Sequence, residues 1–299
     1  MRLWIQNPHL LNLDLVAAAG HELVDRQEAA QVAIGSASVP HRVDPRRVIM
    51  LYLEPPLGQG YSTIYGRAST FRAFGCLVDL SLPNSFLLTQ DPIVYPYGVH
   101  ALRDRRREDT TIRTRRVFYA GTRVGHPPGG DGDYGRVALY KTRNDTVLGL
   151  RALGVDVYAE GVGWEQSTRH EPNWDEIKGH RIDEVMADFH LCMENSRMQG
   201  YISEKIHHGF QSDRVVLYLG CSRIHEHVPA GAFINLNDHF DPRTRQLDLV
   251  EVARRLQGMT QEQYDDILRV ARHWRSVDML EERFNAERDR VTRQVLLFL

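Results

Sequence analysis

Short apolar runs separated by turn residues mark the first third of the chain. The runs at residues 2–6, 30–34 and 47–53 are rich in Leu, Ile, Val and aromatic residues and lie next to Asn, Pro or Gly, a pattern typical of buried strands. Residues 10–24, between the first two runs, have the pattern of a helix. Residues 87–97 contain two prolines and predict an edge strand or an extended loop. The first third therefore predicts a β-α-β start.

The same alternation starts again after residue 116. Strands are predicted at 116–120, 155–158, 190–193 and 215–219, and helices at 137–153 and 203–211. Continuous apolar strands such as 215–219 are typical of a parallel sheet that is covered on both faces. Beyond residue 248 the pattern is helical, with Thr260 and Gln263 at the spacing of a capping box. A last helix is predicted from about residue 277 onward.

A stretch of mixed charge separates the two α/β units. Residues 103–116 hold seven arginines and three acidic residues, which is typical of a solvated linker. We therefore expect an N-terminal Rossmann-like domain over 1–110, a second one over 116–260, and C-terminal helices over 261–299. Two domains agree with the length of 299 residues. Residues 121–135, rich in Gly and Pro, are expected to form a loop in the second domain.

Composition narrows the classes of partner. With 37 basic and 39 acidic residues the formal net charge is −2, so no overall field favours nucleic acid. The apolar runs are shorter than a membrane span, and the three cysteines form no CxxC pair. We expect a cytoplasmic protein with no nucleic-acid partner and no integral membrane segment. Among the basic residues only positions 141, 178 and 205 are lysines.

The segment 189–240 carries the candidate chemistry. A predicted strand ends at residues 194–196, and a helix begins near Ser203 with Lys205 in its first turn. Open α/β sheets bind phosphorylated ligands where strand ends meet helix N-termini. A lysine in the first turn opposes the helix dipole, so a bound anion would favour it there. The alternative is an ordinary surface lysine.

This segment resembles the donor-binding signature of the α-1,3/1,4-fucosyltransferases, glycosyltransferase family 10. The match consists, in order, of Glu194-Asn195-Ser196, Tyr201-Ile202-Ser203-Glu204-Lys205, an apolar strand ending in Gly220, then Pro229, Phe233-Ile234-Asn235 and Asp238. Weaker likeness extends from about residue 45 to 260. The resemblance implies an α/β fold of GT-B architecture, with two Rossmann-like domains that face an interdomain cleft. The C-terminal domain of the family binds GDP-fucose.

The resemblance also implies roles for individual residues. Glu204 is similar to the carboxylate that holds the ribose hydroxyls, and Lys205 to the cation on the diphosphate. Arg143 is similar to the arginine that clamps the diphosphate, with Arg136 as a rival. The residues implied to line the donor pocket are Glu194, Asn195, Ser196 and Tyr201. A guanidinium and an ammonium would together stabilise the negative charge that develops on a departing GDP.

Glu54 is the candidate catalytic base. It directly follows the apolar strand 48–53 and precedes two prolines, and functional residues are often placed where a strand ends in a loop. The strand resembles the one that delivers the base in the family. Inverting transfer needs a carboxylate to take the proton of the acceptor hydroxyl. The alternative is a strand-ending surface glutamate.

Taken together, these features predict an inverting glycosyltransferase that moves fucose from GDP-fucose to a glycan hydroxyl. One alternative is a transferase that uses another nucleotide-sugar. A second is a non-catalytic protein that binds a nucleotide-sugar or a glycan. A third is a hydrolase with Glu54 and Glu194 as its paired carboxylates.

The expected partners are the GDP-sugar donor and a glycan acceptor, and the sequence does not specify an oligomeric state. No cofactor is required beyond the donor substrate. No metal site is indicated, although histidines occur at 207, 208, 225 and 227. His207 and His208 are adjacent on a predicted helix, so their side chains face different directions, which does not suit joint metal ligation.

Overall fold

The structure of the chain is a computed structural model. It describes residues 1–5, 11–26, 29–35, 48–51, 72–74, 93–94, 106–123, 138–166, 181–197 and 201–275, and several residues between 282 and 296.

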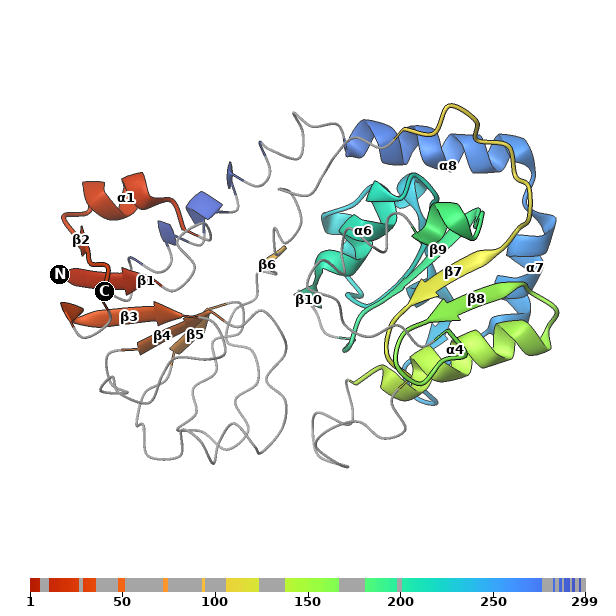
Figure 1. The fold of residues 1–299 in the computed structure, drawn as a ribbon, viewed down its shortest axis with the longest axis horizontal. Coiled ribbons are helices and arrows are strands. Elements are labelled where there is room, and N and C mark those ends of the chain that lie inside the picture. Colours follow the sequence, from red (N-terminus) through yellow and green to blue (C-terminus); the bar gives the residue numbers. More distant parts are fainter. Residues whose placement is uncertain are drawn as a thin grey trace.

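The N-terminal sheet consists of five parallel strands in the order β2-β1-β3-β4-β5 (Figure 1). These are β1 (Arg2–Ile5), β2 (Glu22–Leu23), β3 (Val32–Gly35), β4 (Val48–Leu51) and β5 (Arg72–Phe74). The three apolar runs predicted as strands are confirmed as β1, β3 and β4. Their short length and apolar content suit the inner strands of a parallel sheet.

Helix α1 (Leu13–Ala18) is shorter than the helix predicted over 10–24. The side chain of Asn12 caps its N-terminus. Just beyond its end, Gly20 has φ of +77°, a left-handed conformation that favours glycine and ends the helix. Residues 22–23 then pair with β1 as strand β2. The prediction of a helix is therefore wrong for the second half of that range.

The second sheet is also parallel and has the order β12-β11-β9-β7-β8. Its strands are β7 (Val117–Ala120), β8 (Val157–Glu160), β9 (Phe189–Met193), β11 (Val215–Leu219) and β12 (Ile234–Asn235). Strand β11 has the predicted bounds, β7 and β9 differ from their predictions by one residue, and β8 lies two residues later. Two five-stranded parallel sheets confirm the α/β fold class with the two Rossmann-like units of a GT-B protein, whereas the cleft between them stays a prediction.

Helices of the second unit include α4 (Tyr140–Ala152), α6 (Glu204–Gln211), α7 (Leu249–Gly258) and α8 (Gln261–Trp274). Residues 181–184 are helical as well. The predicted capping box at the start of α8 is present, with Thr260 and Gln263 each bonded to the other's backbone. Strand β6 (Ile93–Val94) lies within residues 87–97, predicted as an edge strand or an extended loop, and pairs with β10 (Tyr201–Ile202), which the pattern did not predict. The paired strands β13 (Phe240–Asp241) and β14 (Gln246–Leu247) were not predicted either.

Alternate residues of the central strands enter two different hydrophobic clusters. On one face, Met193 and Leu219 pack with residues of α4 and α7. On the other face, Cys192 and Tyr218 pack with residues of α6 and with Trp274 of α8. This period of two along each strand places neighbouring residues at a strand end on opposite faces of the sheet.

The arginine-rich segment after residue 106 is anchored to the second sheet. The buried carboxylate of Asp188 accepts hydrogen bonds from the backbone N–H groups of Arg113, Thr114 and Arg115 at 2.7 to 3.1 Å. Arg115 has φ of +55°. The residues of 106–116 are exposed or half-buried, as expected of a solvated segment, but the buried carboxylate binds the backbone of 113–115.

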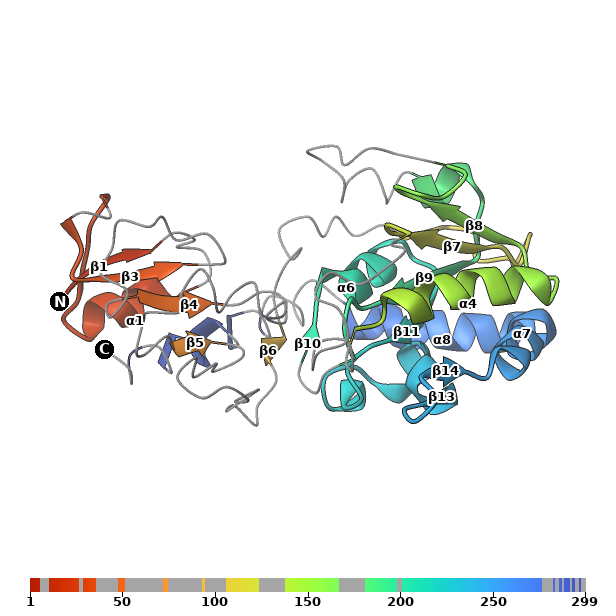
Figure 2. The ribbon, with the colours of Figure 1, turned by 90° about the horizontal axis from the view of Figure 1, so that it is seen from below.

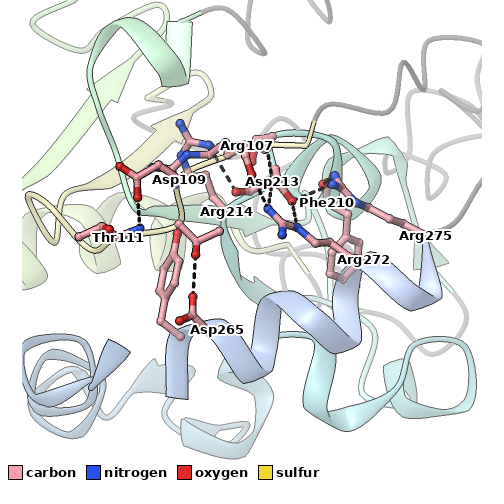
Figure 3. A network of polar contacts seen from close by, with 12 residues as sticks. Arg107, Asp109, Thr111, Phe210, Asp213, Arg214, Asp265, Arg272 and Arg275 are labelled. Atoms are coloured by element: carbon pink, nitrogen blue, oxygen red, sulfur yellow. Dashed lines mark hydrogen bonds and ion pairs between the residues drawn. The ribbon is translucent and has the colours of Figure 1, made fainter. Parts of the chain in front are cut away.

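A second buried carboxylate, Asp213, joins three segments (Figure 3). It accepts from the backbone N–H of Arg107 at 2.6 Å and from the guanidinium groups of Arg272 and Arg275 on or next to α8. Arg272 also donates to the backbone carbonyl of Arg107 at 3.0 Å. These contacts hold the entry to the second sheet, the turn before β11 and the end of α8 together.

The end of the chain returns to its beginning. Asn12 donates from its backbone N–H to Thr292 at 2.8 Å and from its side chain to Asp289 at 2.6 Å. Figures 1 and 2 show the two sheets in separate parts of the molecule, with the β6–β10 pair between them. In the described portion of the chain, no helix has the length and apolar character that crossing a membrane requires.

Candidate active site

One edge of the second sheet collects strand ends and helix starts. The carboxyl ends of β7, β9 and β11 meet there, and α4 and α6 begin there. The backbone fixes this junction, because Leu139 donates to the carbonyl of Asn195 at 2.8 Å and Ala138 forms an isolated bridge with Ser196. Ligands of open α/β sheets bind at such an edge. This is where we place the candidate active site.

Each of the two helices carries a cation in its first turn. Arg143 is the fourth residue of α4, whose first turn has no acidic residue, and Lys205 is the second residue of α6. Positive charge near a helix N-terminus is unfavourable because it meets the positive end of the helix dipole. A bound anion would make the interaction at the helix N-terminus favourable, because it attracts both the cation and the positive end of the helix dipole. The edge is therefore electrostatically suited to an anion.

Arg143 is held by groups from two strands. Its side chain is 5% exposed, Nε donates to the hydroxyl of Tyr119 at 2.8 Å, and Nη1 donates to Oδ1 of Asn195 at 2.6 Å. The rings of Tyr119 and Tyr140 lie 5.8 and 5.5 Å from its guanidinium carbon. Burial by itself lowers the pKa of Arg143, but Tyr119, Tyr140 and Glu194 outweigh it and raise the pKa above its usual value. The guanidinium therefore stays charged.

Lys205 is held from its own helix start. Its Nζ donates to Oγ of Ser203 at 3.0 Å and lies 3.8 Å from a carboxylate oxygen of Glu194. Ser203 is the N-cap of α6 and accepts from the backbone N–H of Lys205. Its own backbone N–H and hydroxyl donate to Glu194 at 2.8 and 2.5 Å. The ammonium of Lys205 is thus connected through the hydroxyl of Ser203 to the buried carboxylate of Glu194.

The structure brings together five of the predicted donor-binding residues, although in different roles. Arg143, Asn195 and Lys205 surround the junction of β9 with the two helix starts. Glu194 is fully buried and its carboxylate points into the protein, toward Ser203. Ser196 is also fully buried, and its hydroxyl has no hydrogen-bond partner among the described residues. A buried, unpaired hydroxyl at this edge is a candidate to bind a ligand.

Other predicted residues are placed only in part. Tyr201 forms half of β10 and Glu204 begins α6, which puts the backbone of both beside the junction. Glu54 and Arg136 lie outside the described residues, and so does the greater part of the predicted loop over 121–135. The role of Glu54 as base stays a prediction.

Several residues of the site were not anticipated from the sequence. Tyr119 and Tyr218 hydrogen-bond to Arg143 and Glu194 from positions 24 residues away. Tyr140 lies three residues before Arg143 on α4, a helical spacing that could have identified it. Arg197 directly follows Ser196, and this adjacency could have identified it. Its Nε donates to Asn237 at 3.3 Å, and partial burial lowers its pKa.

The four histidines do not gather into one cluster. His207 stacks on Trp274 with ring centroids 6.2 Å apart, His208 is buried, and His225 bonds to the side chain of Asn235 at 3.0 Å. Among the residues that the structure describes, no group of three His, Cys, Asp or Glu side chains could hold a metal ion.

Comparison with known proteins gives a family match over this part of the chain. The model of glycosyltransferase family 10 (fucosyltransferase), C-terminal region, matches residues 137–289. No curated protein matches the sequence.

Solved structures match the chain over most of its length at low identity. An alpha1,3-fucosyltransferase has 14% identity and a TM-score of 0.48, over 90% of this chain and 81% of that one. An alpha1,3-fucosyltransferase with GDP-fucose has 14% identity and a TM-score of 0.45 over the same shares. A DNA-modifying beta-glucosyltransferase has 12% identity and a TM-score of 0.46, over 100% of both chains.

Proposed function

Because the chain belongs to glycosyltransferase family 10 and is a glycosyltransferase, we propose that it moves fucose from GDP-fucose to a hydroxyl of a glycan, with inversion at the anomeric carbon. The observation that carries the proposal is the pair of cations at the starts of α4 and α6. Arg143 and Lys205 lie on either side of the end of β9, and neighbouring residues hold each of them. A diphosphate is the anion that would be expected to engage two such cations.

The proposed step moves the fucosyl group from GDP to the acceptor oxygen and removes one proton from that oxygen. The acceptor oxygen attacks C1 of fucose as the bond from C1 to the β-phosphate oxygen breaks, and GDP leaves with the electron pair. Arg143 and Lys205 stabilise the charge that develops on GDP, and a fixed donor of this kind contributes about 3 kcal/mol to the barrier. Glu54 takes the acceptor proton. Glu204 holds the ribose, and Asn195, Ser196 and Tyr201 line the donor pocket.

Two measurements on the wild-type protein test the proposal. GDP should raise the thermal midpoint, whereas UDP and CMP should not, because a ligand that binds only the folded state stabilises it by about 2.7 kcal/mol at 100 times its Kd. GDP-fucose consumption is then followed with and without a panel of acceptor glycans. Acceptor-dependent consumption supports the transferase. Consumption without an acceptor would indicate a hydrolase, and binding without consumption a binding protein.

Variants assign the roles within this scheme. Lys205→Ala should abolish transfer without unfolding the protein, and Glu54→Gln should abolish transfer while it keeps the GDP-induced shift. Arg269→Ala is the control, because that arginine is 72% exposed on α8 and pairs with Asp266. Full turnover by Lys205→Ala or by Glu54→Gln would contradict the role assigned to that residue.

A further inference from the structure

The two strands that flank β9 end on the same pattern. Strand β7 ends in Tyr119-Ala120 and is followed by Gly121, and β11 ends in Tyr218-Leu219 and is followed by Gly220. Both tyrosines are buried. A Cβ atom on Gly121 would lie 2.6 Å from the hydroxyl oxygen of Tyr119, and one on Gly220 would lie 2.5 Å from that of Tyr218. In each strand the phenol therefore runs toward the carboxyl end and places its hydroxyl against the glycine.

The first of these hydroxyls contacts one of the two cations. Tyr119 accepts from Nε of Arg143 at 2.8 Å, on the face of the sheet that α4 covers. Nη2 of the same guanidinium lies 2.6 Å from the place where a Cβ on Gly121 would stand. The glycine thus leaves room for both the hydroxyl and the guanidinium.

The second hydroxyl reaches the other cation through two residues. Tyr218 donates to the carboxylate of Glu194 at 3.2 Å and accepts from the backbone N–H of Cys221 at 3.1 Å. Glu194 accepts from Ser203, and Ser203 accepts from Nζ of Lys205. Burial and the nearby Glu194 raise the pKa of Tyr218 well above its usual value, so its hydroxyl keeps the proton that this chain needs.

The two residues that follow β9 serve opposite faces of the sheet. Successive residues of a strand point to opposite faces, and accordingly Asn195 bonds to Arg143 whereas Glu194 bonds to Ser203. Each cation is therefore bound by one residue that follows β9 and supported by one tyrosine from a flanking strand.

We propose that Tyr119 and Tyr218 are positioning residues for the donor diphosphate, Tyr119 acting through Arg143 and Tyr218 acting through Glu194 and Ser203 on Lys205. The inference rests on the proposed function and adds to it two residues whose hydroxyls bind Arg143 and Glu194. Fixing both cations before the donor arrives removes the cost of reorganising them during the reaction.

Three phenylalanine variants test this assignment. Tyr119→Phe and Tyr218→Phe each remove one hydroxyl and keep the ring, and each should lower kcat/KM for GDP-fucose between about 10- and 100-fold. Tyr264→Phe is the matched control. Tyr264 is equally buried in the same half of the chain, but its hydroxyl donates to the carbonyl of Asp188, before the start of β9. The kcat/KM of Tyr264→Phe should stay within about twofold of wild type, even if its thermal midpoint falls by as much as those of Tyr119→Phe and Tyr218→Phe.

The affinity for GDP then separates positioning from general loosening of the fold. Tyr119→Phe should weaken GDP binding in the wild type and have no further effect in an Arg143→Ala background, since Tyr119 acts through that arginine. Likewise, Tyr218→Phe should weaken GDP binding in the wild type and have no further effect in a Lys205→Ala background. The effects on GDP affinity should be additive when Tyr119→Phe is combined with Lys205→Ala, and when Tyr218→Phe is combined with Arg143→Ala.

The outcomes distinguish this inference from the proposed function. A wild-type protein that neither binds GDP nor transfers fucose overturns both. If the wild-type protein both binds GDP and transfers fucose, the tyrosine variants decide the positioning roles alone. These roles are overturned if the kcat/KM of Tyr119→Phe and Tyr218→Phe equals that of Tyr264→Phe. They are also overturned if the effect of each tyrosine variant on GDP affinity is fully additive with that of its cation variant.

Discussion

At the scale of single residues, Arg143 depends on the shape of its side chain as well as on its charge. The planar guanidinium donates to Tyr119 from one edge and to Asn195 from another, and two tyrosine rings lie near it. A lysine has one compact ammonium group, which cannot make this fork of contacts. Charge alone would not keep a cation in this place.

Arg143→Lys should therefore lower kcat/KM for the donor by about 100-fold, the effect of losing one fixed donor to a developing anion. Steady-state kinetics with GDP-fucose measure it, with the thermal midpoint as a check on folding. Arg254→Lys is the matched control, because Arg254 is exposed on α7 and pairs with Glu251. Kinetics of Arg143→Lys within about threefold of wild type would contradict the assigned role.

At the scale of elements, two helices of the second unit show different uses of a cap. Thr260 begins α8 in a capping box with Gln263, at an exposed position. Ser203 begins α6 but also donates to the buried Glu194 and accepts from Lys205. The first cap serves only its helix, whereas the second links its helix to the candidate site.

Replacing either cap by alanine should lower the free energy of unfolding by about 1 kcal/mol. Ser203→Ala should cost about 1 to 3 kcal/mol more, because the carboxylate of Glu194 then loses a buried donor. Only Ser203→Ala should also weaken GDP binding. Urea unfolding and GDP titration of both variants check this, and equal GDP affinity in the two would exclude the link between cap and site.

At the scale of the whole molecule, Asp213 joins segments that are more than 50 residues apart in sequence. It binds the backbone of Arg107 and the side chains of Arg272 and Arg275 (Figure 3). Burial raises the pKa of Asp213, but the hydrogen bonds from Arg272 and Arg107 and the charge of Arg275 outweigh it, so the pKa is lowered overall. The folded protein therefore favours the ionised carboxylate.

The sign of the pH dependence follows. A carboxylate with a lowered folded pKa stabilises the fold above its unfolded pKa of about 3.9, and this stabilisation is lost as the pH falls through the folded value. Asp213→Asn should cost about 3 to 5 kcal/mol near neutral pH, since it leaves buried arginines without their partner. Asparagine also accepts the φ of +52° at this position, so backbone strain does not confuse the result.

Urea unfolding of this variant between pH 3 and pH 7 is the measurement, and the acid-induced loss of stability should be smaller than in wild type. Asp145→Asn is the control, because Asp145 forms an exposed pair with Lys141 and should cost less than about 1 kcal/mol. An unchanged acid dependence in Asp213→Asn would show that other carboxylates account for it.

The sequence by itself determined most elements of the second unit and, through the family resemblance, which residues are candidates for the chemistry. Strand β11, helix α6 and the capping box at Thr260 follow from hydrophobic period and cap residues, which act over a few neighbouring positions. The same local pattern identified Lys205 at the start of α6. Glu54 was found in this way too, and its role stays a prediction.

Only the tertiary structure decided which residues lie next to one another. The strand order puts β9 between β7 and β11, and this order brings Tyr119 to Arg143 and Tyr218 to Glu194. It also made residues 22–23 an edge strand instead of part of a helix. Pairing across a sheet depends on strands that are far apart along the chain, and no local pattern encodes which strand will be the neighbour.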